Sequence, residues 1–238
     1  MISKYGKKIF LLIVFSIFTL VSFNQAHAHQ LITHDDTHRS FESSLHIPDH
    51  KISWAIYENL GENEAKFYSF EAKHGESLYA SIVVPKLAGL ETYSPTLVLL
   101  GEGIFQNDEI PFVTSLGAEK FPYKGEFPSR EFYEPFGQVT YWERQEVRMD
   151  VPLDGEYFII VMDEQNQSGK YSLAIGTIED FSGSDIFTTL PKAWLETKLF
   201  VNDYISIGIA IIILIAIPAI PIFLISRKII LKQNSQTS

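Results

Sequence analysis

The sequence contains no cysteine. Disulfide bonds and cysteine-based catalysis are therefore excluded, and burial of apolar side chains must hold the fold together. The sequence also lacks a Gly-x-Ser-x-Gly motif, and only one histidine, His74, lies beyond residue 50. Nucleophilic catalysis thus lacks its usual residues. We predict that the protein is not an enzyme, and an anchored hydrolase is the least favoured of the functions considered.

Basic residues are scarce relative to acidic ones. The chain has 19 Lys and Arg against 29 Asp and Glu, and six of the basic residues lie at its two ends, before residue 9 and after residue 226. Residues 29–203 therefore carry 13 basic and 29 acidic side chains, a formal net charge of −16. A surface this acidic repels phosphate backbones, which excludes nucleic acid as a partner.

Charge is absent from two long segments. The first, residues 9–23, follows three lysines and precedes Ala26-His27-Ala28. A secretory signal peptide typically has a basic N-terminal region, an apolar segment and small residues before the cleavage site. We predict a signal peptide at residues 1–28, cleaved after Ala28, and an uncleaved N-terminal anchor is the alternative.

The second uncharged segment covers residues 204–225, which is long enough to cross a bilayer as a helix. Asp203 precedes it, and Arg227 and Lys228 follow it. Because basic residues stay on the cytoplasmic side, we predict a transmembrane helix at 204–226 and a cytoplasmic tail at 227–238. The protein would then be a single-pass type I protein of the cell membrane, with residues 29–203 outside. In the juxtamembrane segment 181–203, Pro191 can open a helix that lies at the membrane surface with Trp194 or packs against the domain.

No helical periodicity is visible between residues 51 and 177. Instead, Ile52, Trp54 and Ile56 alternate with other side chains, and Val147, Met149 and Val151 do the same. Turn signals separate several such runs, which favours an antiparallel β-sandwich over residues 51–180. Residues 29–50 show no period, and we interpret them as an arm or linker.

Two segments resemble the pre-peptidase C-terminal (PPC-like) domains. They are "AKFYSFEAKHGESLYASI" and "VPLDGEYFIIVMDEQNQSGKYSLAIG". The second segment contains the family's two Gly-x-Tyr elements, "GEYFIIV" and "GKYSLAIG". The resemblance covers about 100 residues and implies a mainly β fold, an antiparallel jelly-roll-like β-sandwich with binding or folding roles rather than catalysis. An insert at residues 102–138 departs from the family's pattern, so no family binding residue is carried over.

Aromatic residues are concentrated in and just after the insert 102–138. Stacked rings flanked by charged groups are typical of a sugar- or peptide-binding platform. The alternative is that the rings pack against one another and form a small core within the insert. The candidate ligand-binding residues are Tyr133, Glu134, Phe136, Tyr141, Trp142 and Arg144.

Six of the seven histidines lie between residues 27 and 50. Cleavage after Ala28 would give His29 a free amine beside its imidazole, which is the start of a histidine-brace copper site. His34 and His38, four residues apart around Asp36, could complete that site or bind zinc separately. The alternative is a flexible arm without a metal, since an unstructured segment loses conformational entropy when it binds one.

Together these observations predict a membrane-anchored exterior module that recognises a protein, an envelope component or a glycan and performs no catalysis. The alternative function is binding of copper or zinc by His29, His34, Asp36 and His38. No other cofactor is expected.

Overall fold

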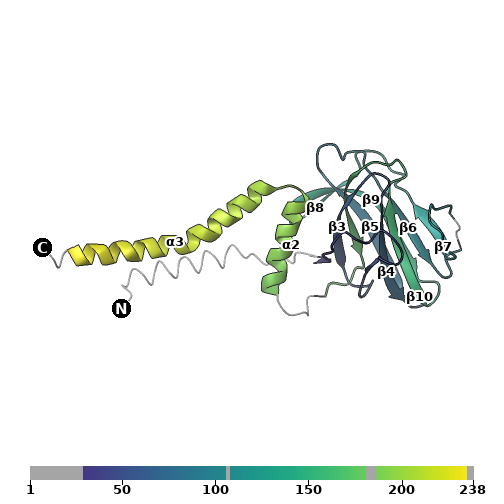
Figure 1. The fold of residues 1–238 in the computed structure, drawn as a ribbon, viewed down its shortest axis with the longest axis horizontal. Helices are drawn as coiled ribbons and strands as arrows, with labels where there is room; N and C mark the ends of the chain where they lie inside the picture. Colours follow the sequence, from purple (N-terminus) through teal and green to yellow (C-terminus); the bar gives the residue numbers. More distant parts are fainter. Residues whose placement is uncertain (1–28, 106–107, 181–185, 235–238) are drawn as a thin grey trace.

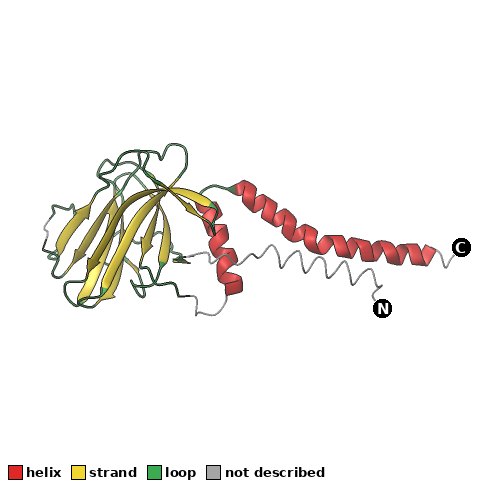
Figure 2. Ribbon diagram, turned by 180° about the vertical axis from the view of Figure 1, so that it is seen from behind, coloured by secondary structure: helices red, strands yellow, loops and turns green. Residues whose placement is uncertain are grey.

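The computed structural model describes residues 29–105, 108–180 and 186–234 of the chain. The expected signal peptide at 1–28 lies outside these residues. Within them, eleven strands form two sheets that pack face to face, and two helices follow the last strand (Figure 1). The β-sandwich predicted from the sequence is confirmed, and helices are confined to its C-terminal side (Figure 2).

The first sheet has six strands and provides one half of the core. Its neighbouring strands are antiparallel except for the first pair, which is parallel. In spatial order the strands are β1 (Gln30–Leu31), β3 (Trp54–Leu60), β11 (Gly169–Ile175), β5 (Ser77–Pro85), β9 (Val139–Asp150) and β8 (Glu131–Glu134).

The second sheet has five strands and faces the first. Its pairs are antiparallel except β2 with β4. In spatial order the strands are β2 (Leu45–His46), β4 (Ala65–Ala72), β10 (Gly155–Met162), β6 (Thr96–Gly101) and β7 (Gly117–Phe121).

The inward faces of the two sheets form the main core. Alternate residues point between the sheets, as the period-2 pattern requires. On β3 these are Ile56 and Leu60, on β4 Tyr68 and Phe70, and all four are buried. The consecutive strands β4 and β5 are joined by a turn that contains Gly75 in the left-handed region at φ 80°. They lie in different sheets and pair with β10 and β11, so they do not form the hairpin that their order in the sequence suggests.

The insert 102–138 contributes β7, β8 and long connections. Part of it covers the outward face of the five-stranded sheet, where the ring of Phe112 packs edge-on against Phe67, 5.0 Å between centroids. This portion of the insert therefore shares a second, smaller core with the outward face of that sheet. Phe105, by contrast, is exposed.

Helix α2 (Ile186–Phe200) packs across the outward face of the six-stranded sheet. It begins before Pro191, so that proline lies inside the helix and not at its start as the sequence suggested. The ring of Phe200 stacks on Tyr57 at 4.6 Å, and the Tyr57 hydroxyl lies 2.9 Å from that of Thr197. Leu195 and Leu199 face solvent, so α2 has one face on the sandwich and a second apolar face uncovered.

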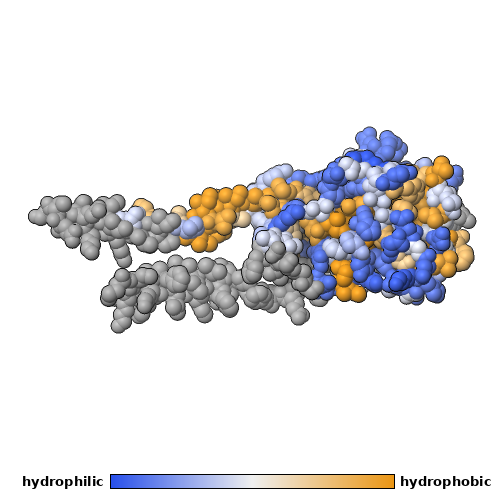
Figure 3. All heavy atoms as spheres, turned by 60° about the horizontal axis from the view of Figure 1, so that its bottom comes forward, coloured by the Kyte–Doolittle hydropathy of each residue, from blue (hydrophilic) through white to orange (hydrophobic). Residues whose placement is uncertain are grey.

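Helix α3 (Tyr204–Asn234) leads away from the sandwich (Figure 1). Apolar side chains cover its first half, whereas the surface of the sandwich is mixed (Figure 3). The described part of the chain holds no helix whose length and apolar content suffice for a membrane crossing.

Candidate metal centre

The N-terminal segment 29–50 is built into the sandwich. Its strand β1 pairs with β3 of the six-stranded sheet, and its strand β2 pairs with β4 of the five-stranded sheet. The chain between β1 and β2 therefore crosses from one sheet to the other along the same side of the sandwich. The sequence suggested an arm or linker without regular structure, because its polar residues show no period. The structure shows that short backbone pairings at two sheet edges position it instead.

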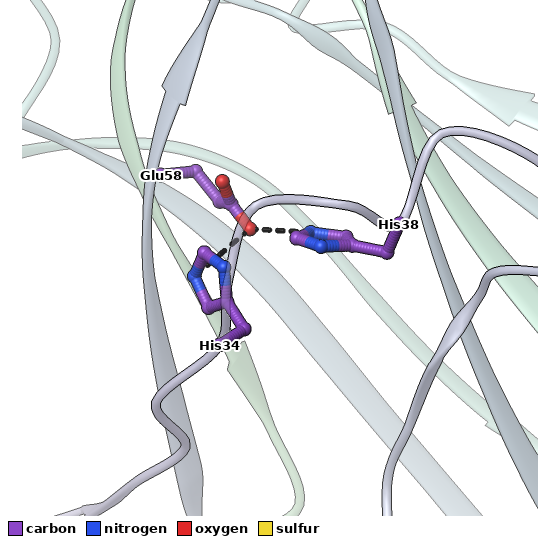
Figure 4. Close-up of side chains that lie close together, drawn as sticks. All are labelled: His34, His38 and Glu58. Atoms are coloured by element: carbon purple, nitrogen blue, oxygen red, sulfur yellow. Dashed lines mark hydrogen bonds and ion pairs between the residues drawn. The ribbon is translucent and has the colours of Figure 1, made fainter.

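Glu58 is an acidic residue on the inward face of β3. It lies between the apolar residues Ile56 and Leu60 in the alternation, and only 1% of its surface is exposed. Removing a carboxylate from water is costly unless hydrogen bonds or opposite charges compensate. The crossing segment supplies such partners, because His34 and His38 both point at this carboxylate (Figure 4).

The three side chains form a compact cluster of possible ligand atoms. The Nε2 atom of His38 lies 2.6 Å from Oε1 of Glu58, and Nε2 of His34 lies 3.2 Å from the same oxygen. The two imidazole rings meet edge to face with their centroids 4.7 Å apart. One ligand atom from each residue lies within 4.8 Å of the others.

These separations can be compared with those around a bound ion. Bonds of about 2.0–2.2 Å in tetrahedral geometry place ligand atoms about 3.3–3.6 Å apart. The distance from His34 to Glu58 is close to this value, and His38 would need to move away from Glu58 by less than about 1 Å. The carbonyl oxygen of Tyr57, 3.1 Å from Nε2 of His34, offers a further oxygen donor.

Two polar atoms of the cluster have no hydrogen-bond partner among the described residues. They are Nδ1 of His38 and Oε2 of Glu58, and both are buried. Buried polar atoms normally have partners, so such an atom calls for an explanation. A cation held beside Oε2 would supply one for the carboxylate.

Two tyrosines support the carboxylate from inside the core. The Tyr68 hydroxyl donates to Oε1 of Glu58 at 3.1 Å and lies 2.8 Å from the Tyr171 hydroxyl. Burial raises the pKa of both tyrosines well above the usual value, so both hydroxyls stay protonated. Outer partners of this kind fix the orientation of metal-binding side chains.

Of the four metal-binding residues predicted from the sequence, the structure brings together His34 and His38. His29 lies apart, with its Nδ1 2.6 Å from the Ser53 hydroxyl. Asp36 pairs with Arg39 at 2.7 Å and with Lys66. The histidine brace is therefore not formed among the described residues, and Glu58 stands where the sequence suggested Asp36.

Of the six predicted ligand-binding residues, Glu134, Tyr141 and Arg144 line one cavity on the outward face of the six-stranded sheet, and the other three do not. Trp142 points into the core, and Tyr141 packs in the cluster beneath α2. Arg144 is buried and donates to the carbonyl oxygens of Tyr93 and Glu91, so it holds loops together. The remaining three are Tyr133, which is exposed, and Glu134 and Phe136, which are half-buried.

The sequence alone did not single out three residues of the cluster and its surroundings, Glu58, Tyr68 and Tyr171. One signal was present, because Glu58 continues the alternation of Ile52, Trp54 and Ile56 and therefore had to point inward. An acidic residue in phase with an apolar face indicates a buried partner. The sequence offered no sign of which histidines would reach it.

No protein-family model matches the chain, and no curated protein matches it. Among solved structures, the PliG lysozyme inhibitors of Salmonella Typhimurium and Aeromonas hydrophila are similar to it, at 16% and 12% identity and TM-scores of 0.32 and 0.33. They cover 56% and 63% of this chain, and 96% and 98% of their own chains are matched.

The pre-peptidase C-terminal domain of the Bacillus anthracis collagenase is also similar, at 12% identity and a TM-score of 0.30, over 55% of this chain and 91% of that domain. The family that the sequence resembles is thus among the structural matches. At these identities and scores the matches support no conclusion about family or function.

Proposed function

We propose that this domain binds a divalent transition-metal ion through His34, His38 and Glu58. The observation that carries the proposal is the convergence of two imidazole nitrogens and one carboxylate oxygen within 4.8 Å of one another at the edge of the sandwich. Two nitrogens and one oxygen suit Zn²⁺ and Cu²⁺, whereas Ca²⁺ and Mg²⁺ prefer shells made of oxygen.

The origin of the ligands suggests what the ion does for the fold. His34 and His38 belong to the crossing segment, and Glu58 belongs to β3. An ion bound by all three would tie this segment to the sandwich and stabilise the folded state by its binding free energy.

Burial of the cluster favours binding over catalysis. The side chain of Glu58 is 1% exposed, that of His38 is 2% exposed and that of His34 is 13% exposed. A catalytic metal needs an open position that a substrate can reach. The narrow access at His34 suits entry of an ion better than that of a substrate, which supports a protein that captures or retains metal.

We also propose that the domain works outside the cytoplasm and is attached to a membrane at its C-terminal end. The support is the uncharged sequence 204–225 and the exposed apolar side chains along α3, among them Ile205 and Leu214. Such a surface is costly to leave in water. Cleavage of a signal peptide and crossing of the bilayer by residues 204–226 stay predictions from the sequence.

The sequence also suggested recognition of a protein or glycan by aromatic residues near 133–144. Because Trp142 and Arg144 point into the core and the loops, those six residues support this function less well than the cluster supports metal binding.

Metal binding is tested on the full chain, purified in detergent without a histidine tag. Calorimetric titration should give about one Zn²⁺ or Cu²⁺ per chain and far weaker binding of Ca²⁺. His38→Ala should weaken Zn²⁺ binding at least about 100-fold. His46→Ala, an exposed histidine on β2 of the same segment, is the matched control and should leave it unchanged. If both variants lose the same affinity for Zn²⁺, or if neither loses any, His38 is not a ligand of the ion.

Topology is tested by adding protease to intact cells that carry an epitope after Ser238. The proposal expects the sandwich to be digested and the epitope to survive. Digestion of the epitope from outside would show the opposite orientation.

A further inference from the structure

The two sheets differ in how their edges are protected. On one side, the short strands β1 and β2 cover β3 and β4. On the other side, Asp108 covers the outer edge of β7, because its amide donates to Ala118 O at 3.0 Å and its carboxylate accepts from the Lys120 amide at 2.7 Å. Among the described residues, β8 pairs only with β9, so its second edge lacks such a cover.

The register identifies the backbone groups on this edge. The Glu143 amide donates to Arg130 O at 2.9 Å, so these residues form a hydrogen-bonded pair. Such pairs alternate along an antiparallel ladder, which turns the backbone of Phe132 toward β9. The amides and carbonyls of Glu131 and Tyr133 therefore point outward.

The side chains at the centre of β8 leave it open to pairing. Edge strands are usually blunted by short length, charged side chains, proline or a bulge, and the glutamates at the two ends of β8 carry the sign that a basic segment would neutralise. β8 reads Glu-Phe-Tyr-Glu, and Phe132 is 39% exposed and Tyr133 57% exposed. Exposed aromatic side chains beside unpaired backbone groups favour the addition of another strand.

A cavity of about 360 Å³ adjoins this edge on the outward face of the six-stranded sheet. Phe132 and Glu134 of β8 line it together with Tyr79 and Tyr141, and Ser81 and Ala174 contribute small side chains. Charged side chains of both signs complete the lining: Arg130, Glu143, Arg144 and Glu146. Burial raises the pKa of the Glu134 carboxyl, although the Phe136 and Gly137 amides donate to it and the charge of Lys198 opposes the shift. A second cation next to that carboxylate would further offset its loss of solvent.

We propose that β8 is a docking edge for an extended, basic segment of a partner protein. The segment adds a strand antiparallel or parallel to β8 through the outward groups of Glu131 and Tyr133. Side chains on the same face as Phe132 then lie over the cavity, where a lysine or arginine meets Glu134 and the tyrosine rings. Backbone bonds supply affinity, and the cavity supplies selectivity.

The charge of the domain decides between a foreign segment and a second copy of this chain. Residues 29–203 hold 13 basic and 29 acidic side chains. Two such domains repel each other, whereas a basic segment is attracted. The proposal therefore commits to a basic partner, and self-association becomes an outcome that the test can detect.

The test begins with a random heptapeptide library panned against the immobilised full chain in detergent. We expect enrichment of extended sequences rich in Lys or Arg and β-branched residues. The most enriched heptapeptide is then synthesised and titrated against two variants. Tyr133→Pro removes the outward amide and keeps the bonds to β9, and should weaken binding at least tenfold. Tyr133→Val keeps the amide and should stay within about threefold of the original protein.

Hydrogen exchange on the unmodified chain gives a readout that does not depend on the folding of the proline variant. Peptide binding should slow exchange at the Glu131 and Tyr133 amides and leave Phe132, already bonded to β9, unchanged. No enrichment, an acidic consensus, equal binding to both Tyr133 variants or self-association through β8 would overturn the proposal. Zn²⁺ binding is measured in parallel. Because the metal site and β8 are separate, loss or retention of Zn²⁺ binding neither supports nor contradicts docking at β8.

Discussion

The Glu58 carboxylate lies 2.6 Å from the imidazole of His38, although twenty residues separate the two in the chain. The contact exists because the crossing segment closes the side of the sandwich where β3 places an acidic group inward. Each sheet edge holds one end of the segment, so the two histidines are presented to Glu58 by the fold and not by their own spacing. A preformed geometry of this kind lowers the entropic cost of binding an ion.

Glu58→Gln should separate the role of the carboxylate from that of the histidines. Glutamine has nearly the same shape and can still accept the bond from the Tyr68 hydroxyl, but it is neutral and a poor ligand for Zn²⁺. We expect the fold to survive and the affinity for Zn²⁺ to fall at least about 100-fold. Calorimetric titration of the variant beside His46→Ala measures this difference. Unchanged affinity would mean that the ion is held elsewhere.

The two tyrosine hydroxyls should influence the metal in a graded way. Tyr68 donates directly to Glu58, and Tyr171 contacts Tyr68, one step further away. Loss of an outer hydrogen bond typically weakens metal binding about 10–100-fold. We therefore expect Tyr68→Phe to weaken Zn²⁺ binding by about tenfold or more, and Tyr171→Phe to have a smaller effect. The reverse order of the two variants would disagree with this arrangement.

The stability of the metal-free protein should decrease as the pH falls below about 6.5, partly because of His50. Burial lowers the pKa of His50, although Glu76 and Asp49 oppose the shift. In the window between the folded pKa and the unfolded value near 6.5, the unfolded chain binds the proton more readily. Its free energy of unfolding must therefore decrease as pH decreases through this window. Burial also lowers the pKa of His29, which adds a slope of the same sign.

This pH dependence is measured by urea unfolding in EDTA between pH 7.5 and 5. His50→Gln should flatten the slope, and His46→Gln, at an exposed position on the neighbouring strand, should leave it as it was. A slope that His50→Gln does not change would assign the pH dependence to other groups.

Docking of α2 should depend on Phe200 and hardly on its neighbour in the sequence. Phe200 is buried against Tyr57, whereas Leu199 is 46% exposed. Truncation of a buried phenylalanine costs about 3–5 kcal/mol in a large core. Because the cluster around Phe200 is small, we expect Phe200→Ala to lower the free energy of unfolding by about 2–3 kcal/mol. Leu199→Ala should stay within about 0.5 kcal/mol. Denaturant unfolding of the two variants in the same detergent compares them, and equal losses would contradict the observed packing.

Much of the sandwich could be predicted from the sequence because its strands alternate clearly. The segments that became β3 and β9 were visible as period-2 runs, and those that became β4, β5, β10 and β11 were visible as runs between turn residues. Their pairing could not be predicted, because strands that follow each other in the sequence, such as β4 and β5, lie in different sheets. The crossing segment could not be predicted in this way. Its strands are two residues long, and a backbone pairing that short leaves no periodic pattern.

The candidate site was predicted in part for a related reason. The i and i+4 spacing singled out His34 and His38, which are two of the three residues in the cluster. Asp36 lies between them in sequence, yet its backbone adopts the left-handed conformation at φ 64° and its side chain points to Arg39 and Lys66. Local spacing therefore favoured a carboxylate that lies outside the cluster, since Glu58 reaches the two histidines only through the packing of one sheet edge.

The central claim is that two imidazoles and one carboxylate hold a single ion, and X-ray absorption at the zinc edge tests it most directly. The full chain is loaded with one equivalent of Zn²⁺ in detergent. We predict scattering from two imidazole rings and from oxygen, with bonds of about 2.0–2.2 Å. In His38→Ala, one imidazole should be lost from the spectrum. A shell of oxygen alone, or an unchanged spectrum in His38→Ala, would contradict the assignment of the site to His34, His38 and Glu58.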